Sequence, residues 1–432
     1  MKFTKDFQKL GIFFILLFFV SVCSILTCSV GVYANDEVKK QSESELSEET
    51  EKSETKKSEN TILNFESKHV ILIEPVSGKI IYEKQSDERV SPASITKIMT
   101  ILLIYEAIDE GKIKLEDIVT VSAHAASMGG SQIFLEEGER QTVQDLLKSI
   151  IIASANDSSV AMAEFIAGSE GSFVELMNQK AKELGMNNTN FMNACGLDAD
   201  NHYSSAKDIA LMSKELIVKY PQVEQYSTTR QDTIIHTTRR GSEEFGLTNT
   251  NKLLNSFDGI TGLKTGSTSK ALYCLSATAR RDDMNLVGVV LAAPNPATRF
   301  AEAAQLLNFG FANYTIAKGD PKDKVMGNVK IFKGEEDFVD VKIKDEIVFL
   351  SEKGSAQELE GNIEIIESIK SPVEMNTKAG EVVYYYNGIE VGRTDLITTK
   401  NVGVASMGKI LTDLFNRWTN FNSRQKSPTS KI

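Results

Sequence analysis

Apolar and polar positions between residues 61 and 320 follow two different periods, which predicts short strands mixed with longer helices. Apolar runs at 69–74 and 79–83 flank a Pro-Val-Ser-Gly turn and predict one hairpin, and runs at 271–280 and 285–292 predict a second. Apolar residues at helical spacing predict helices at 95–107, 143–152, 159–167, 172–184 and 300–314. The pattern predicts an α+β unit in which helices pack on a sheet beside a mainly helical lobe.

After residue 325 the pattern changes to short alternating apolar runs separated by charged turns. These runs lie at 327–332, 338–341, 346–350 and 382–386. They predict a small all-β domain at 325–400 that follows the larger unit at 61–320. No residue in this smaller region points to catalysis.

The region 402–422 predicts an amphipathic helix. At helical spacing its apolar residues cover one arc of roughly 140°. These residues are Val404, Met407, Ile410, Leu411, Leu414, Phe415, Trp418 and Phe421. Such a helix can pack on its own domain, or it can lie in the plane of a membrane interface. The only tryptophan of the chain, with Phe415 and Phe421 near it, favours the membrane-associating interpretation.

The N-terminus places Lys2, Lys5 and Lys9 before an uncharged run at 10–34 that ends in Val32-Tyr33-Ala34. This order of positive, apolar and small residues is typical of a secretory signal peptide at 1–34. About 25 uncharged residues can also span a bilayer, so an uncleaved anchor is the alternative. Both interpretations predict an exported, extracytoplasmic protein.

Composition and charge narrow the classes of function. The 432 residues, 41% hydrophobic and 25% charged, are ordinary for a soluble globular protein and exclude a multi-span membrane protein or a collagen-like fibre. A formal charge of −11 argues against a nucleic-acid partner, because phosphate contacts need positive charge. Residues 35–60 are almost entirely Glu, Lys, Ser and Thr, which predicts a disordered charged linker.

Cysteine and histidine usage argues against a metal site. No Cys-x-x-Cys occurs, and the four histidines are scattered singly, so we expect no metal and no cofactor. Cys195 and Cys274 are the two cysteines beyond the signal region. The sequence alone leaves open whether they form a disulfide.

The first candidate motif is Ser94-Ile95-Thr96-Lys97 at the start of an apolar helix. Residues three apart share a helix face, so the Lys97 amine can lie beside the Ser94 hydroxyl. A serine nucleophile needs a base within hydrogen-bond reach, and a lysine with a depressed pKa can serve. The Ser94 N–H at a helix start can also donate to an oxyanion. Taken alone, the motif could equally be a solvated helix start.

Two further motifs are equally ambiguous when each is taken alone. Ser154-Ala155-Asn156 lies between two predicted helices, where Ser and Asn are common caps and turn formers. Lys264-Thr265-Gly266-Ser267 lies on a predicted strand. A cation, a hydroxyl and a glycine on a strand edge suit an extended substrate that ends in a carboxylate, but an ordinary strand end can carry the same residues.

The order and context of the three motifs resemble the penicilloyl serine transferases, and among them the D-alanyl-D-alanine carboxypeptidases, which are low-molecular-mass penicillin-binding proteins. The stretches at 129–133, 152–157 and 202–206 strengthen the resemblance. It implies a β-lactamase/transpeptidase-like catalytic domain, with an antiparallel sheet, helices and a helical lobe, followed by the small all-β domain and the amphipathic helix. It also implies removal of the terminal D-alanine from peptidoglycan stem peptides, acylation by β-lactam antibiotics and association with the outer face of the cytoplasmic membrane.

The resemblance implies a role for each motif residue. It makes Ser94 the acylated nucleophile and Lys97 its general base. Ser154 would relay a proton to the leaving D-alanine, while Asn156 would hold Lys97 and the substrate backbone. The remaining roles are substrate binding by Lys264, Thr265, Gly266 and Ser267, with the N–H groups of Ser94 and Ser267 forming the oxyanion hole.

Two positions depart from the pattern of the relatives. Thr250 stands where some relatives have an arginine that contacts the substrate carboxylate, and Asn193-Ala194-Cys195 replaces their usual residues before Gly-Leu.

Two other functions are alternatives to a carboxypeptidase. A serine β-lactamase shares the three motifs, but it needs a carboxylate poised for deacylation and usually lacks the β domain and terminal helix. A non-enzymatic binding module is the second alternative.

Overall fold

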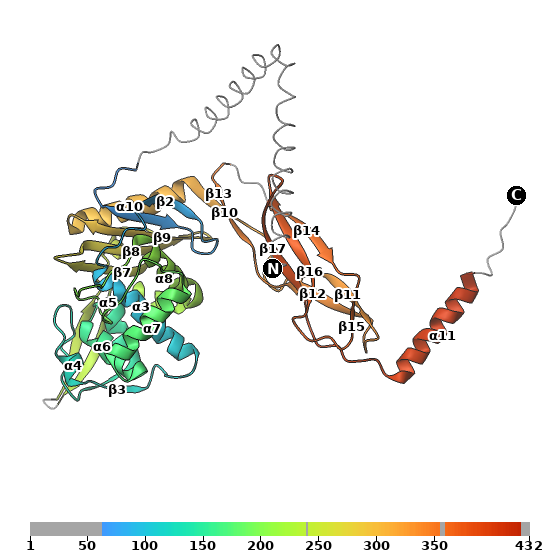
Figure 1. The fold of residues 1–432 in the computed structure, drawn as a ribbon, viewed down its shortest axis with the longest axis horizontal. Helices are drawn as coiled ribbons and strands as arrows, with labels where there is room; N and C mark the ends of the chain where they lie inside the picture. The colour runs from blue at the N-terminus through green and yellow to red at the C-terminus, as the bar shows by residue number, and fades with distance from the viewer. Residues whose placement is uncertain (1–62, 239–240, 355–358, 425–432) are drawn as a thin grey trace, which may run out of the picture. The chain divides into compact units, whose positions relative to one another are not determined.

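The structure is a computed structural model that describes residues 63–424, except 239–240 and 355–358 (Figure 1). The predicted signal peptide and charged linker therefore lie outside the described residues. Among the helices within these described ranges, none is both long and apolar enough to cross a membrane.

A five-stranded sheet forms the centre of the larger unit, with the order β2-β1-β9-β8-β7 and antiparallel neighbours throughout. The two predicted hairpins are confirmed as β1–β2 and β8–β9. The strands are β1 (His69–Ile73), β2 (Ile80–Lys84), β7 (Ile260–Thr268), β8 (Leu272–Arg281) and β9 (Met284–Ala293). All of β1 and most of β9 are buried, as expected for strands covered on both faces.

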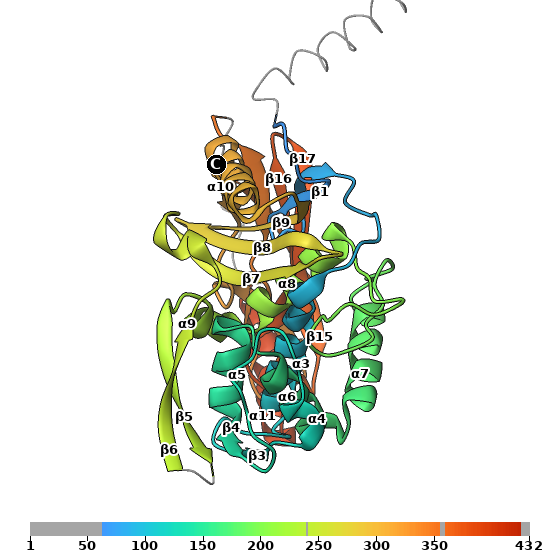
Figure 2. The ribbon, with the colours of Figure 1, turned by 90° about the vertical axis from the view of Figure 1, so that its left-hand side faces the viewer.

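Helices cover both faces of this sheet. Contacts with β8 and β9 place α10 (Pro296–Asn313) on one face and α8 (Ala206–Lys219) on the other, as Figure 2 shows. The predicted C-terminal helix of this unit is confirmed, but it begins earlier than expected. Asn295 caps it by accepting a hydrogen bond from the Thr298 N–H, and Pro296 occupies the first turn, where proline is favourable.

The helical lobe is built around one buried helix, α3 (Lys97–Asp109), preceded by the 3-10 turn η1 (Ala93–Thr96). Ten of its thirteen residues are buried, which is why the segment is apolar on nearly every side. The other predicted helices are confirmed at or near their expected bounds as α5 (Val143–Ile152), α6 (Asn156–Ala167) and α7 (Glu170–Glu183).

Shorter elements complete this lobe. They are β3 (Ile118–Thr120), α4 (Ala123–Ala126), β4 (Arg140–Thr142), η2 (Pro221–Val223), α9 (Glu224–Ser227), β5 (Gln231–Thr238), β6 (Gly241–Thr248) and η3 (Lys252–Asn255). Strands β5 and β6 form an antiparallel hairpin that was not predicted.

The C-terminal region contains the expected β-structure, in a six-stranded sheet with the order β14-β16-β17-β12-β11-β15. Its strands are β11 (Val325–Phe332), β12 (Phe338–Ile343), β14 (Glu360–Ile365), β15 (Ser368–Lys370), β16 (Lys378–Tyr386) and β17 (Ile389–Thr398). The predicted strand at 346–350 corresponds to β13 (Val348–Glu352), which lies outside this sheet. It pairs instead with β10 (Tyr314–Lys318), which directly follows α10.

The terminal amphipathic helix, α11 (Met407–Arg424), begins five residues after the predicted start at 402. Val402 and Val404 form isolated β-bridges with Val373 and Gly334, so the backbone there is extended. The large apolar side chains on α11 are highly exposed: Met407, Leu411, Leu414, Phe415 and Trp418 are 58–73% exposed.

Candidate active site

Ser94 and Lys97 lie where η1 passes into α3, one turn apart. The Lys97 Nζ atom donates to the Ser94 Oγ atom at 3.1 Å, so the predicted i, i+3 arrangement is present. Lys97 is fully buried, whereas Ser94 is partly exposed. The hydroxyl is therefore open to a substrate, while the amine reaches it from inside the protein.

The Lys97 amine lies among polar groups that hold it in place. It donates to the Asn156 side-chain oxygen at 2.6 Å and to the Cys195 carbonyl at 2.7 Å, in addition to Ser94. Burial lowers the pKa of Lys97 to about 8, although the charges of Cys195 and Asp157 oppose this shift. A lysine with this pKa can lose its proton near neutral pH and act as a base.

The second motif connects α5 to α6 and is anchored to a neighbouring loop. Ser154 has a left-handed φ of 63°, and Asn156 is already the first residue of α6, three residues before the predicted helix start at 159. The Asn156 amide donates to the Gly129 carbonyl at 2.6 Å, and its backbone N–H donates to the Ser131 carbonyl at 2.7 Å. These bonds orient the Asn156 oxygen toward Lys97.

Asp157 holds the same loop further along. Its buried carboxylate accepts hydrogen bonds from the backbone N–H groups of Ile133, Leu135 and Ser158 at 2.9–3.3 Å. Burial raises the pKa of Asp157, in opposition to these hydrogen bonds. Asn156 and Asp157, the two residues that follow the Ser154-Ala155 turn, therefore both hold the loop after Gly129 in place.

The third motif lies on β7, the edge strand of the central sheet. An open strand edge can pair with an extended peptide through backbone hydrogen bonds. A Cβ atom at Gly266 would lie 3.0 Å from the backbone nitrogen atoms of Ser94 and Ile95, so the glycine permits β7 to approach η1 closely. The approach brings the segment of Lys264, Thr265, Gly266 and Ser267 to the nucleophile.

Lys264 is a second buried cation at the site. It is 1% exposed, and its Nζ atom donates to the Thr265 carbonyl at 3.2 Å. Burial lowers the pKa of Lys264 well below its usual value, with smaller contributions from the charges of Lys97 and Arg299. Among the residues described, Ser154 makes no hydrogen bond with Lys264 or Lys97, so an ordering effect of Lys264 on Ser154 would be electrostatic.

Thr250 occupies the position that departs from some relatives. It accepts a hydrogen bond from the Thr265 hydroxyl at 2.7 Å. A threonine is too short to supply the arginine contact, and the Thr265 hydroxyl has to turn its proton from Thr250 toward a substrate carboxylate in order to bind it.

Three functional positions were not recognised from the sequence. The Cys195 carbonyl is a ligand of Lys97, and Gly196 has a φ of +86° at a position where a Cβ atom would clash with the Ala93 carbonyl. Arg299 on α10 donates to the carbonyls of Gly266 and Cys274 at 3.2 Å, which supports β7 from behind. Backbone carbonyls and contacts between residues far apart leave no local sequence pattern. Gly196 is the exception, because a glycine can indicate a left-handed backbone or a close contact.

The two cysteines are both buried and free, so they do not form a disulfide. A search of the described residues for groups of three or more His, Cys, Asp or Glu side chains placed to hold a metal finds none.

The geometry suits a serine nucleophile with a lysine base, beside an edge strand that carries a lysine and a threonine hydroxyl. Hydrogen bonds unite Ser94, Lys97 and Asn156, while Gly266 packs against η1. This arrangement can transfer an acyl group from an extended substrate to Ser94.

Comparisons with known proteins give a consistent result. Residues 52–295 match the D-alanyl-D-alanine carboxypeptidase family, and residues 316–404 match the C-terminal domain of penicillin-binding protein 5. The D-alanyl-D-alanine carboxypeptidase DacF of Bacillus subtilis is 42% identical over 83% of this chain and 92% of its own length. DacC of Escherichia coli is 34% identical over 77% of this chain and 83% of its own length.

Solved structures show the same similarity. Penicillin-binding protein 5 from Haemophilus influenzae has a TM-score of 0.66 at 30% identity, covering 80% of this chain and 99% of that one. PBP3 from Streptococcus pneumoniae has a TM-score of 0.64 at 28% identity, covering 78% of this chain and all of that one. Both the catalytic fold and the C-terminal β domain are therefore shared with penicillin-binding proteins.

Proposed function

Because this chain belongs to the D-alanyl-D-alanine carboxypeptidase family, we propose that Ser94, Lys97, Ser154 and Asn156 carry its catalysis and that Lys264, Thr265, Gly266 and Ser267 bind its substrate. The enzyme is a D-Ala-D-Ala carboxypeptidase with a penicillin-binding protein fold. The β-lactamase alternative is not favoured, because the named relatives are carboxypeptidases and residues 316–404 match a penicillin-binding protein domain.

Acylation begins when the Ser94 Oγ atom attacks the carbonyl between the two D-alanines. The neutral Lys97 amine, 3.1 Å away, takes the hydroxyl proton. The N–H groups of Ser94 and Ser267 stabilise the developing oxyanion. The proton that Lys97 has taken passes through the Ser154 hydroxyl to the nitrogen of the leaving D-alanine, which leaves Lys97 neutral again. The carboxylate of that D-alanine is held by the Lys264 charge and the Thr265 hydroxyl.

Deacylation returns the enzyme to its starting state. Water attacks the acyl-enzyme ester on Ser94, and Lys97 again accepts a proton before returning it to the Ser94 oxygen as the ester breaks. The shortened peptide leaves with a new carboxylate. A β-lactam enters the same sequence through its strained amide, but it leaves no separate amine product and keeps Ser94 blocked for longer.

The observation that carries these roles is the buried Lys97 amine shared between Ser94 and Asn156. The test is release of D-alanine from a diacetyl-lysyl-D-alanyl-D-alanine peptide. Ser94→Ala should abolish release, whereas Asn156→Ala should lower kcat through the loss of Lys97 orientation. Full activity of Ser94→Ala would overturn the assignment.

Export and membrane association form the second part of the proposal. A signal peptide at 1–34 and a charged linker at 35–60 would place the catalytic domain, 61–320, and the β domain, 325–400, in the cell-wall space. The exposed apolar side chains of α11, within the predicted 402–422 region, support contact with the outer face of the cytoplasmic membrane. Cell fractionation of the full chain, with and without residues 1–34, tests the export part.

A further inference from the structure

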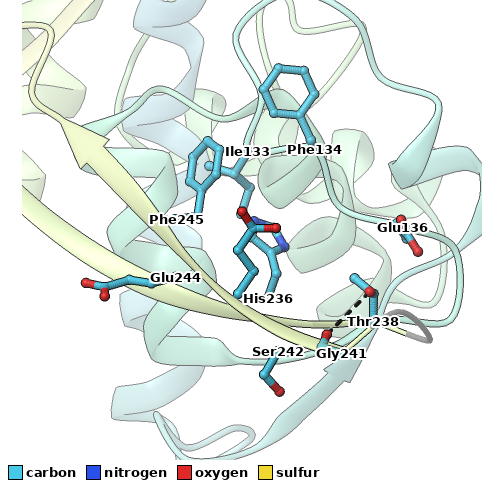
Figure 3. Close-up of a pocket in the computed structure, with 10 residues that line it drawn as sticks. Ile133, Phe134, Glu136, His236, Thr238, Gly241, Ser242, Glu244 and Phe245 are labelled. Carbon is cyan, nitrogen blue, oxygen red and sulfur yellow. Dashed lines mark hydrogen bonds between the residues drawn. The ribbon is translucent and has the colours of Figure 1, made fainter.

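A pocket separate from the catalytic residues lies between the loop that follows Gly129 and the β5–β6 hairpin (Figure 3). Its volume is about 450 Å³, within the range of roughly 300–1,000 Å³ that is usual for small-ligand sites. The side chains that matter are Ile133, Phe134, Glu136, His236, Glu243 and Phe245. None of them takes part in the acyl-transfer site.

One wall of the pocket is aromatic. The Phe134 ring is 65% exposed and lies edge-on to the Phe245 ring, with 6.1 Å between their centroids. Phe245 lies in turn 5.2 Å from the His236 ring. Figure 3 shows Phe134, Ile133 and Phe245 along the same side of the pocket. A large exposed ring held beside a second ring provides an apolar face for a ligand.

His236 lies between the hairpin and the loop. Its Nδ1 atom hydrogen-bonds the buried Glu139 carboxylate at 2.7 Å, and Gln141 donates to the same carboxylate oxygen at 2.7 Å. His236 is only 9% exposed. Its Nε2 atom makes no hydrogen bond of normal geometry within the described part of the chain, although the Glu139 contact and, to a smaller extent, the Ile133 backbone raise the pKa of the ring. An unpaired buried polar atom is costly, so Nε2 is a position at which a ligand gains a hydrogen bond.

Two carboxylates complete the pocket. Glu243 is directly opposite His236 in the β5–β6 register, so both side chains are on the same face of the hairpin. Glu136 lines the pocket from the loop. Neither carboxylate forms an ion pair with a cation in the part of the chain that the structure describes. Both line the pocket, so a ligand bound there can donate hydrogen bonds to them.

These groups select for a ligand with hydroxyl groups and an apolar face. Nδ1 carries the hydrogen shared with Glu139, so Nε2 accepts a hydrogen bond when the ring is neutral and donates one when it is charged. A hydroxyl both donates and accepts, so it matches Nε2 in either state, whereas an ammonium group matches only the neutral ring. Hydroxyl and amide donors also match Glu136 and Glu243, and the C–H face of a sugar ring matches Phe134.

We propose that this pocket is a subsite for an N-acetylated sugar of the peptidoglycan glycan strand, so that the enzyme recognises the polymer beyond its peptide end. The distance between this pocket and the catalytic residues permits one substrate molecule to reach both. Gly129 contacts Asn156, and Ile133 in the pocket is four steps further along the chain, a span of at most about 14 Å. A pentapeptide stem whose end lies at Ser94 extends up to roughly 17 Å toward its sugar.

The test compares three substrates of the same enzyme. They are a disaccharide pentapeptide, the identical pentapeptide without sugars, and the diacetyl-lysyl-D-alanyl-D-alanine peptide. We expect kcat/KM to be higher with the sugars than without them. Phe134→Ala and Glu243→Gln should each reduce this preference by about three- to tenfold, as loss of one aromatic contact or hydrogen bond does, while rates on the sugar-free peptides stay unchanged.

Glu137→Gln is the matched control, because Glu137 lies in the same loop as Glu136 and carries the same charge but does not line this pocket. It should leave the preference intact. Unchanged sugar preference in both pocket variants would overturn the proposal. An equal loss on the pentapeptides with and without sugars would also overturn it, because the pocket would then serve the peptide, for example through the amine of its diamino acid.

Direct binding separates this proposal from the catalytic one. Saturation-transfer NMR with N,N′-diacetylchitobiose should detect binding to enzyme whose Ser94 is already acylated by benzylpenicillin, and Phe134→Ala should weaken the signal. Absence of binding to the intact enzyme would reject the sugar site while leaving D-alanine release untouched. If the intact enzyme binds N,N′-diacetylchitobiose but does not release D-alanine, the result would instead count against the catalytic assignment.

Discussion

Lys97 and Ser94 are joined by a 3.1 Å hydrogen bond across one turn, yet only Ser94 is open to solvent. This difference in exposure suits the two residues to the different roles proposed for them. Burial makes the lysine a usable base, while exposure lets the serine meet a substrate. Asn156 and the Cys195 carbonyl hold the amine in place, so little reorganisation is needed when the proton moves.

The rate of acylation by benzylpenicillin should therefore depend on the ionisation of Lys97. Because only the unprotonated amine accepts a proton, the rate should rise with pH and level off above the pKa of about 8. Lys97→Arg keeps the charge but cannot act as a base, so it should lower the rate by a factor on the order of 10² or more. Stopped-flow measurement across pH checks both statements, and a flat wild-type profile would indicate another base.

His202 should make stability depend on pH. Burial lowers the pKa of His202 from 6.5 to about 4, and the neutral ring accepts from the Met192 N–H and hydrogen-bonds the Thr96 hydroxyl. As pH falls, His202 takes up a proton in the unfolded chain before it does so in the folded protein. Its contribution to the free energy of unfolding is therefore complete above pH 6.5 and is lost as pH falls toward 4. The expected loss is on the order of 3 kcal/mol.

Urea unfolding of the wild type and of His202→Gln at several pH values measures this contribution. The variant should be less stable near neutral pH and should lose less stability on acidification. If both proteins show the same slope of unfolding free energy against pH, His202 does not carry the effect.

Gly196→Ala should disturb the nucleophile from a distance. The new Cβ atom would clash with the Ala93 carbonyl next to Ser94, in addition to the cost of a left-handed φ. Gly168→Ala is the matched control, because Gly168 has a φ of +80° but open space around its Cβ position.

Both variants should lose about 1–2 kcal/mol of stability from the backbone conformation, and Gly196→Ala should lose more. Only Gly196→Ala should also slow acylation by benzylpenicillin. Thermal unfolding and acylation rates provide the two readouts. Equal acylation rates in the two variants would show that the Ala93 contact does not position Ser94.

The exposed face of α11 should bind lipid. Leu411, Leu414, Phe415 and Trp418 are each more than half exposed, and burying them in a membrane interface gains about 25 cal/mol per Å² of apolar surface. Protein that starts at Asn35 and ends at Ser406 should keep its activity on small peptides but no longer sediment with anionic liposomes. Equal sedimentation of this shortened protein and of protein that also starts at Asn35 but ends at Ile432 would contradict membrane binding by α11.

Local patterns predicted much of the fold and several of the residues that lie together at the proposed site. The bounds of α5 match the predicted 143–152, because Thr142 caps a strongly amphipathic segment. The Ser94–Lys97 contact was also predictable, since it depends on helix geometry alone. Helix α8 was missed although Ile209, Met212 and Leu216 have helical spacing behind the cap residue Ser205, so its signal was present in the sequence.

Other features depend on contacts that no local pattern contains. Lys97 and Cys195 are 98 residues apart, and the carbonyl that binds Lys97 has no side-chain identity to recognise. Arg299 supports β7 from a helix that follows it in the chain, and its role appears only once α10 packs on the sheet. The start of α11 was misplaced because isolated bridges at Val402 and Val404 replace the first predicted turn.

The central claim is that Ser94, activated by Lys97, is the residue that becomes acylated. Intact-mass measurement after incubation with benzylpenicillin, followed by peptide mapping, tests it most directly. We predict one adduct per chain, located on the peptide that contains Ser94 and absent from Ser94→Ala. An adduct on Ser154, or one that persists in Ser94→Ala, would contradict the assignment.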